Sequence, residues 1–190
     1  FGSRLPLGMG NNNSLGVSID GYVPRQNEEV VISYSTVGPR YFETMTIPVL
    51  QGREYNDNDT ATSANVIVIS EATARRYWPN GNALGGRIRM GGDQIAEVIG
   101  IVADSKYSSI NETPRPQLFL SINRFQVSTL RLFLRTSGTP APLVTDVRNA
   151  IRTLDASLPV YDARTMTEHM QGAVFAQRMA ADLLGAMGVL

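Results

Sequence analysis

Side chains that could carry out acid–base or metal chemistry are few in this chain and lie far apart in the sequence. His169 is the single histidine, and the chain has no cysteine. A His/Cys metal centre is therefore excluded, and a nucleophilic pair would need a serine that the pattern does not identify. Thr165 and Glu168 have capping-box spacing, which places His169 just inside a helix. A lone histidine there is typical of a packing or surface residue, so we predict no catalytic role.

The run Asn56-Asp57-Asn58-Asp59 carries the oxygen-rich side chains that Ca²⁺ prefers. However, it lacks the glycine and the distal glutamate of an EF-hand loop. Asn and Asp also favour turns, because their side chains accept hydrogen bonds from nearby backbone N–H groups. We therefore interpret the run as a turn and predict no metal site.

Phosphate-binding features are incomplete throughout the chain. The segment Gly81–Gly86 is glycine-rich, but the Lys-Ser or Lys-Thr of a Walker loop does not follow it. The 17 basic residues are balanced by 17 acidic ones and are scattered singly or in pairs such as Arg75-Arg76. Such a distribution does not follow a nucleic-acid backbone. We therefore predict no nucleotide cofactor and no nucleic-acid partner.

The elements that must position any site begin with a strand–helix–strand unit. Alternation of side chains predicts a strand at Val30–Thr36, and Gly38-Pro39 predicts the start of a short helix that ends near Thr46. A short edge strand is expected at Pro48–Leu50, before a turn at Gly52. A second unit of the same kind comprises a strand, a helix and a strand at Thr129–Arg135, Pro140–Leu154 and Leu158–Tyr161.

The middle of the chain predicts a further group of strands and one helix. Val66–Ile69 is an apolar strand that leads into a helix at Glu71–Trp78, with Ser70 as its N-cap. Tyr77 and Trp78 are expected to anchor this helix against its sheet. Three more strands are expected around Ile88–Met90, at Ala96–Val102 and at Gln117–Ile122.

Several of these segments carry a family resemblance. VGPRYFETMTIPVLQGREY, VIVISEATARRYWP, LGGRIRM, EVIGIVAD and LDASLPVYDARTM occur in this order without large gaps. Together they resemble the extracytoplasmic domain of MacB-type, FtsX-like ABC transporter permeases, and in particular the orphan permeases of that superfamily. The similarity extends from Glu29 to the end of the chain. It is more specific than any single motif.

The resemblance implies an α+β fold with two lobes. Two β-α-β units, laid side by side, would form a porter-like lobe with a four-stranded sheet, since each unit alone has too little apolar surface to be stable. A smaller α+β lobe would be inserted between them. The implied boundaries are a membrane-side linker at 1–28, the porter-like lobe at 29–55 and 124–182, the inserted lobe at 56–123, and the start of a transmembrane helix at 183–190.

The end of the chain leaves two interpretations open. Leu183–Leu190 consists of eight uncharged residues, far fewer than the roughly 20 needed to span a bilayer. An ordinary amphipathic terminal helix is therefore one interpretation, and the resemblance favours the other, a truncated membrane helix. At the other end, the Gly- and Asn-rich start lacks the positive-then-apolar order of a signal peptide.

The resemblance also implies a function without covalent chemistry. The domain would lie on the periplasmic face of the bacterial inner membrane and couple ATP-driven helix movement to export or signalling. Its expected partners are an ABC ATPase subunit, a second permease copy and a periplasmic adaptor. The alternative is a free-standing extracytoplasmic module whose two lobes close on a small molecule. The feature that separates the two is whether apolar residues follow Leu190.

Arg53 matches the Gly-Arg position of the family, because it follows Gly52. We expect Arg53, Asp57 and Asp59 at a partner contact or at a contact between the lobes. A solvated turn arginine that pairs with a nearby carboxylate is the alternative interpretation of Arg53.

Overall fold

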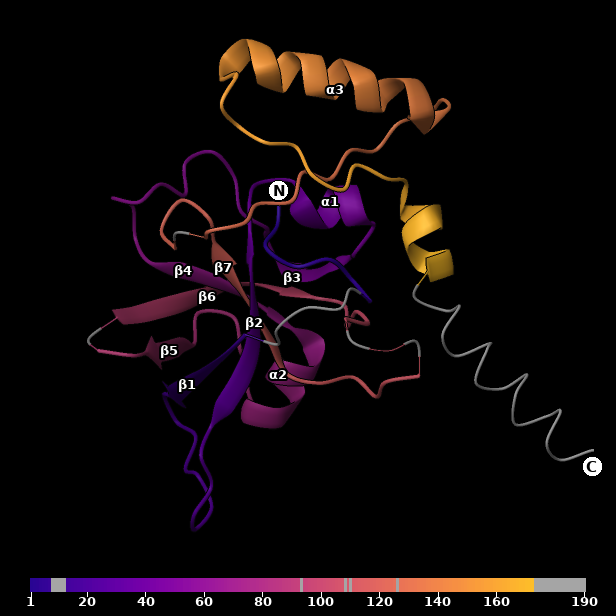
Figure 1. Cartoon of the computed structure of the whole chain (residues 1–190). Coiled ribbons are helices and arrows are strands. Elements are labelled where there is room, and N and C mark those ends of the chain that lie inside the picture. Colours follow the sequence, from indigo (N-terminus) through magenta and orange to yellow (C-terminus); the bar gives the residue numbers. More distant parts are fainter. Residues whose placement is uncertain (8–12, 93, 108, 110, 126, 173–190) are drawn as a thin grey trace, which may run out of the picture. The chain divides into compact units, whose positions relative to one another are not determined.

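The computed structural model (Figure 1) describes residues 1–7, 13–92, 94–107, 109, 111–125 and 127–172. The chain divides into two compact units, Phe1–Leu134 and Arg135–Leu190. Within the described ranges, no helix has the length and hydropathy needed to cross a bilayer. The expected membrane helix at 183–190 lies outside the described residues.

Unit 1 is built on one sheet of seven strands, in the order β3-β6-β4-β7-β2-β1-β5. Strand β5 pairs with β6 as well as with β1, so the sheet returns on itself and β3 continues along β6. Two pairs, β4 with β6 and β2 with β7, are parallel, and the others are antiparallel. The elements are β1 (Ser14–Ile19), β2 (Val31–Val37), α1 (Tyr41–Met45), β3 (Val49–Gly52), β4 (Val66–Ser70), α2 (Glu71–Tyr77), β5 (Arg87–Met90), β6 (Gln94–Val102) and β7 (Gln117–Ser121).

The central strands β4 and β7 are covered on both faces, which explains their continuous apolar sequences. Alternate residues belong to two separate core clusters. One cluster includes Ile67, Ile69, Leu118 and Leu120 together with Tyr77 of α2. The other includes Val68 and Phe119 together with Tyr41 and Phe42 of α1. Figure 1 shows α1 and α2 against different parts of the sheet, as this division requires.

Aromatic rings fill the cluster beneath α1. The ring of Phe42 meets the ring of Phe119 edge to face, with centroids 4.9 Å apart. Tyr41 makes the same kind of contact with Phe42 and with Phe133. Such ring pairs stabilise a core beyond the effect of their buried area. The five-residue helix α1 is therefore held by its side chains rather than by its own length.

Unit 2 contains α3 (Pro140–Leu154) and a helical segment at 166–172. The bounds of α3 are those that the apolar spacing predicts. Its first turn carries prolines, as expected where backbone N–H groups have no partner within a helix. None of its residues is buried. The segment at 166–172 begins with the predicted capping box: Glu168 N–H donates to Thr165 Oγ1 at 3.2 Å, and Thr165 N–H donates to Glu168 Oε2 at 2.8 Å.

Several local predictions were wrong. Strand β1 lies inside the predicted linker at 1–28, where Leu15, Val17 and Ile19 alternate with smaller or polar residues. Helix α1 begins at Tyr41, because Arg40 has φ 58° and so interrupts the helix after Pro39. The segment at 129–135 forms only an isolated bridge between Arg131 and Gly2, and 158–161 is not a strand. An apolar pattern becomes a strand only where another strand offers hydrogen bonds.

The predicted two-lobe arrangement is not confirmed, although the mixed α+β class is. Strands β2 and β3 fall in the predicted porter-like lobe, and β6 and β7 fall in the predicted inserted lobe. Nevertheless, β2 pairs with β7 and β3 pairs with β6 in one sheet. The other half of the predicted porter-like lobe lies mostly in unit 2, so the lobe boundaries stay a prediction.

Candidate functional site

Arg53 and Asp59 form a bidentate ion pair directly after the end of β3. Arg53 Nη1 donates to Asp59 Oδ2 at 2.7 Å, and Nη2 donates to Oδ1 at 2.9 Å. The side chain of Asp59 is 8% exposed and that of Arg53 is 47% exposed. The guanidinium holds the pKa of the Asp59 carboxyl below its usual value. The pairing of Arg53 with a nearby carboxylate is thus what the structure shows, and a partner contact stays a prediction.

The loop that contains Asp59 is a turn held by its own polar groups. Asn56 N–H donates to Asp59 Oδ2 at 2.9 Å, and Asn58 N–H donates to Asn56 Oδ1 at 2.9 Å. Asn123 Nδ2 donates to the carbonyl oxygen of Asp59 at 2.8 Å. The interpretation of Asn56–Asp59 as a turn is confirmed. Asp57 is exposed in this loop and takes no part in the ion pair.

The two residues after Arg53 attach the same segment to α1 and to the centre of the sheet. Phe42 N–H donates to Glu54 Oε2 at 3.2 Å, and burial raises the pKa of Glu54. The Tyr55 hydroxyl donates to the carbonyl oxygens of Phe119 and Val66, at 2.8 and 3.1 Å. Burial raises the pKa of Tyr55 far above its usual value, so this hydroxyl stays a donor. We call Gly52–Tyr55 together with Asp59 the Arg53 corner.

Two glycines allow the Arg53 corner to pack against β6. Gly52 and Gly100 are opposite each other in the β3–β6 ladder. A Cβ atom on Gly100 would lie 2.1 Å from the carbonyl oxygen of Arg53, and one on Gly52 would lie 2.1 Å from that of Ile99. Gly52 also has φ 70°, which side chains rarely adopt. The corner therefore requires glycine at both positions. The contacts of the corner are structural: they hold the edge strand β3, the loop at Asn56–Asp59 and helix α1 against one sheet.

A polar cavity lies at the other end of the central strands, where β4 ends at Ser70 and β7 begins at Gln117. Its volume is about 30 Å³. It is lined by Arg4, Ser33, Ser70, Ser105, Arg115 and Gln117, with Tyr107, Glu112 and Phe119 completing the wall. We call it the Gln117 cavity. The cavity carries no sequence signal, because its residues come from five distant segments and no spacing pattern relates them.

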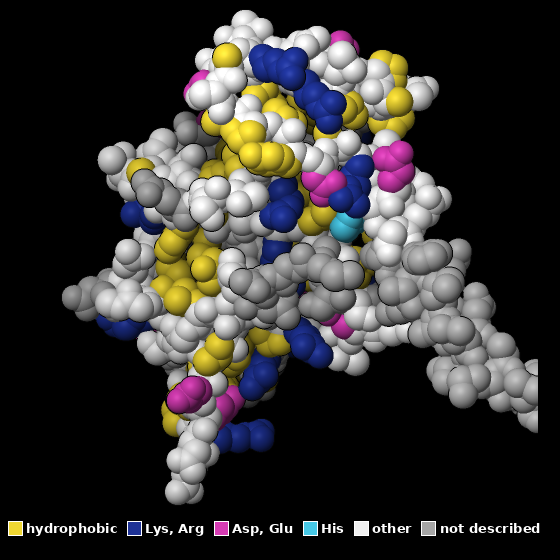
Figure 2. Space-filling model, in the orientation of Figure 1, with side chains coloured by type: hydrophobic (Ala, Val, Ile, Leu, Met, Phe, Trp, Pro, Cys, Tyr) yellow, Lys and Arg dark blue, Asp and Glu magenta, His cyan; other side chains and the backbone are white. Residues whose placement is uncertain are grey.

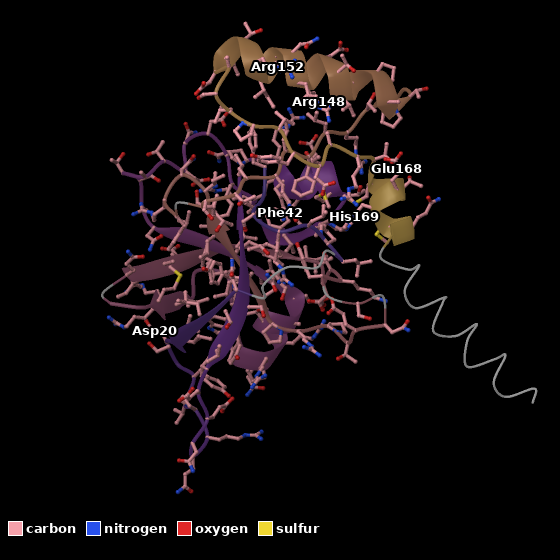
Figure 3. All side chains as sticks on the ribbon, in the orientation of Figure 1. Asp20, Phe42, Arg148, Arg152, Glu168 and His169 are labelled. Carbon is pink, nitrogen blue, oxygen red and sulfur yellow. The ribbon has the colours of Figure 1, made fainter. Side chains whose placement is uncertain are left out.

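His169 is 8% exposed and lies in the first turn of the helical segment at 166–172 (Figure 3). The sequence leaves a packing residue and a surface residue open, and the burial of His169 agrees with the first. Among the described residues, no group of three or more His, Asp or Glu side chains could hold a metal ion. On the face shown in Figure 2, Lys and Arg side chains form separate small groups, some of them beside Asp or Glu side chains.

The chain matches the family described as MacB-like periplasmic core domain over residues 11–154. A search of curated proteins found no match. Among solved structures, the fold is similar to the periplasmic region of MacB from Actinobacillus actinomycetemcomitans, with 16% identity and a TM-score of 0.54. That alignment covers 75% of this chain and 63% of the MacB region, so this chain spans less than two thirds of it.

Two further solved structures are similar. A domain of a putative permease from Porphyromonas gingivalis is 14% identical, with a TM-score of 0.47 and coverage of 84% of this chain and 78% of that one. The extracellular domain of the noncanonic ABC-type transporter YknZ from Gram-positive bacteria is 20% identical, with a TM-score of 0.40 and coverage of 58% and 54%. The family match includes every strand of the sheet and extends to the end of α3. This chain therefore belongs to the MacB-like periplasmic core domain family.

Proposed function

We propose that this chain is the extracytoplasmic domain of an ABC transporter permease and carries ATP-driven movement of membrane helices to the periplasmic side of the inner membrane. The match to the MacB-like periplasmic core domain over residues 11–154 is the observation that supports this most strongly. The domain acts without covalent chemistry. The permease works with an ABC ATPase subunit and with a second copy of itself.

The sheet of unit 1 suits this role because it transmits a displacement without deforming. Its central strands are covered on both faces, and β5 links the sheet back to β6. The Arg53 corner fastens the edge strand β3 and helix α1 to the same body. A packed body of this kind moves as a whole when the helices that carry it shift. Unit 1 is therefore the element that moves.

Arg53 and Asp57 are the residues of the predicted contact set that can reach a partner. Both are exposed, whereas the side chain of Asp59 is buried and holds Arg53 in position. An arginine held by a carboxylate on one side can still offer its remaining N–H groups to a second acceptor. In this proposal, Arg53 and Asp57 contact a periplasmic adaptor and Asp59 is a positioning residue.

A free-standing module that closes on a small molecule between two lobes fits the sheet less well. Closure of this kind needs a hinge between residues 29–55 and 56–123. The ladders β2–β7 and β3–β6 both cross that boundary. Bending there would break backbone hydrogen bonds, and those of the β2–β7 ladder lie among buried residues, where no water can replace them.

The test is a distance measurement in the full-length permease, reconstituted with its ATPase subunit. Spin labels at Gln51→Cys in β3 and Arg89→Cys in β5 report on the two predicted lobes, and both positions are exposed. Labelled permease diluted with unlabelled permease gives the distance within one unit 1. This distance should be the same without nucleotide and with ATP trapped.

A single label at Arg89→Cys in both copies supplies the second arm of the experiment. The distance between copies should change when ATP is trapped, because each unit 1 moves as a body. A change of the Gln51–Arg89 distance with ATP would show that the sheet deforms. An unchanged distance between copies would show that ATP does not move the domain.

A further inference from the structure

Strand β3 is the free edge of the sheet among the described residues. The other six strands each have a neighbouring strand on both sides, because β5 pairs with β1 as well as with β6. Strand β3 pairs with β6 alone. Within the described ranges, no backbone hydrogen bond joins Val49–Gly52 to any segment other than β6. The N–H and C=O groups that β3 directs away from β6 are therefore open to another strand.

The side chains of β3 are uncharged and partly apolar. All four residues are exposed, and the exposed fractions of Val49 and Leu50 are 38% and 47%. Leu50 is the extra residue of a bulge, because Val49 pairs with Val102 and Gln51 pairs with Ile101. Edge strands are often protected from pairing by a charged side chain, lysine above all. Strand β3 has no such side chain, so its apolar surface stays available for contact.

The fold covers its other unpaired strand segment. Strand β1 pairs with β2 only at Val31–Ser33. Beyond that point, Ser3 N–H donates to the carbonyl oxygen of Thr36 at 2.8 Å, and Thr36 N–H donates to Ser3 Oγ at 2.9 Å. Among the described residues, no segment does the same for β3. The open edge is thus particular to β3.

The length of β3 limits which partner can occupy this edge. One added strand along four residues buries far less than the roughly 1,200 Å² of a stable complex, so a freely diffusing partner would bind weakly. A partner held beside unit 1 at an effective concentration of about 1 mM needs no larger contact. In the proposed permease, the second copy is such a partner, because the membrane holds it beside the first. Two copies of an uncharged strand also do not repel each other.

We propose that the β3 edges of two copies pair antiparallel in at least one nucleotide state of the permease, about a two-fold axis near Leu50. This inference rests on the proposed function, which supplies the second copy. The two-fold axis makes the edge complementary to itself, so the outward N–H groups of each strand meet the outward C=O groups of the other. The antiparallel direction places the two Arg53 residues at opposite ends of the pair, so like charges do not meet.

The experiment is oxidative crosslinking of the full-length permease, reconstituted with its ATPase subunit, without nucleotide and with ATP trapped. This chain has no cysteine of its own, and Leu50→Cys or Gln51→Cys supplies the only cysteine of the permease. At least one of the two variants should crosslink the copies about tenfold faster than the control, because cysteines bridge only when their Cα atoms come within about 7 Å. The control is Arg89→Cys, at an exposed position of β5, which has a neighbour on both sides.

A charged side chain at the edge tests the pairing in a second way. Leu50→Lys, combined with Gln51→Cys, brings two like charges together near the axis and should slow crosslinking about tenfold. Val31→Lys, combined with the same cysteine, is the matched control, because Val31 is 51% exposed but lies in β2, away from the free edge. It should leave the rate unchanged. Unchanged thermal unfolding of the 190-residue chains with these substitutions shows that they are folded.

Purification of two differently tagged copies of the permease separates the possible failures. If the tags purify together but neither cysteine in β3 crosslinks faster than Arg89→Cys in either nucleotide state, the pairing of β3 is wrong and the proposed function stands. Equal crosslinking with Leu50→Lys and Val31→Lys would overturn the pairing in the same way. If the tags do not purify together, the permease has no second copy, and both the pairing and that part of the proposed function fail.

Discussion

Helices α2 and α3 obey the same sequence rules but differ in what they bury. The seven-residue α2 buries Ala72, Thr73 and Tyr77, whereas α3 has 15 residues and buries none. Helix α2 follows β4 without a linker, so the strand fixes its direction against the sheet. Helix α3 follows a segment that makes only an isolated bridge. The apolar spacing predicts a helix in both cases, but the neighbouring strand decides its burial.

The largest expected effect is a difference in the free energy of unfolding between a substitution at the centre of unit 1 and one in α3. Phe119 is 1% exposed and contacts the ring of Phe42, so Phe119→Ala should lower the free energy of unfolding by about 3–5 kcal/mol. Leu154 at the end of α3 is 86% exposed, and Leu154→Ala should change the free energy of unfolding by less than about 0.5 kcal/mol. Denaturant unfolding measures both. Similar costs for the two substitutions would contradict the distinction between the two regions.

A matched pair of glycine substitutions tests the same difference through the backbone. In Gly100→Ala, the new methyl group would meet the carbonyl oxygen of Arg53 at 2.1 Å, and overpacking of this kind costs about 2–3 kcal/mol. In Gly138→Ala of unit 2, the nearest atom lies 3.9 Å away, so stability should hardly change. Thermal unfolding of the two variants provides the comparison. A tolerated Gly100→Ala would show that the Arg53 corner is looser than its contacts imply.

The smallest expected effect is a pH dependence of the stability that the Arg53 corner contributes to the fold. The pKa of Asp59 is lowered in the folded chain, so its ion pair stabilises the fold above the ordinary carboxyl pKa of about 4. This stabilisation is lost as the pH falls through the lowered value. Asp59→Asn should therefore cost about 1 kcal/mol near pH 6, and this cost should shrink steadily as the pH is lowered below about 4. Glu54 is present in both proteins, so its raised pKa cancels in the difference. If the destabilisation by Asp59→Asn does not vary with pH, the ion pair between Arg53 and Asp59 does not stabilise the fold.

Much of the fold could be predicted because its elements carry local signals. The apolar runs of β4 and β7, the cap at Ser70 and the helical spacing of α3 are all readable without tertiary information. Strand β1 carries a readable alternation too, which the Gly- and Asn-rich segment before it obscured. Local signals thus predict the helices and strands, but not which strands pair with each other.

Strand order and the polar sites lie beyond local signals. Nothing in the sequences of β3 and β6 indicates that they pair, and their pairing joins segments of the two predicted lobes in one sheet. Arg53 comes directly after the turn at Gly52, and Asp59 lies six residues further along the chain. An ion pair between these two residues could therefore be anticipated from the sequence. The Gln117 cavity could not, because Ser33, Ser105 and Gln117 meet only through the order of the strands.

Hydrogen exchange of the 190-residue chain tests most directly whether unit 1 is a single body. The slowest amides of β2, which lies in the predicted porter-like lobe, should share one free energy of opening with those of β4 and β7. Amides of α3 should exchange faster, because no burial protects that helix. If instead β2 opens in a separate step from β4 and β7, the chain has two lobes that unfold independently, and a rigid sheet that transmits movement is contradicted.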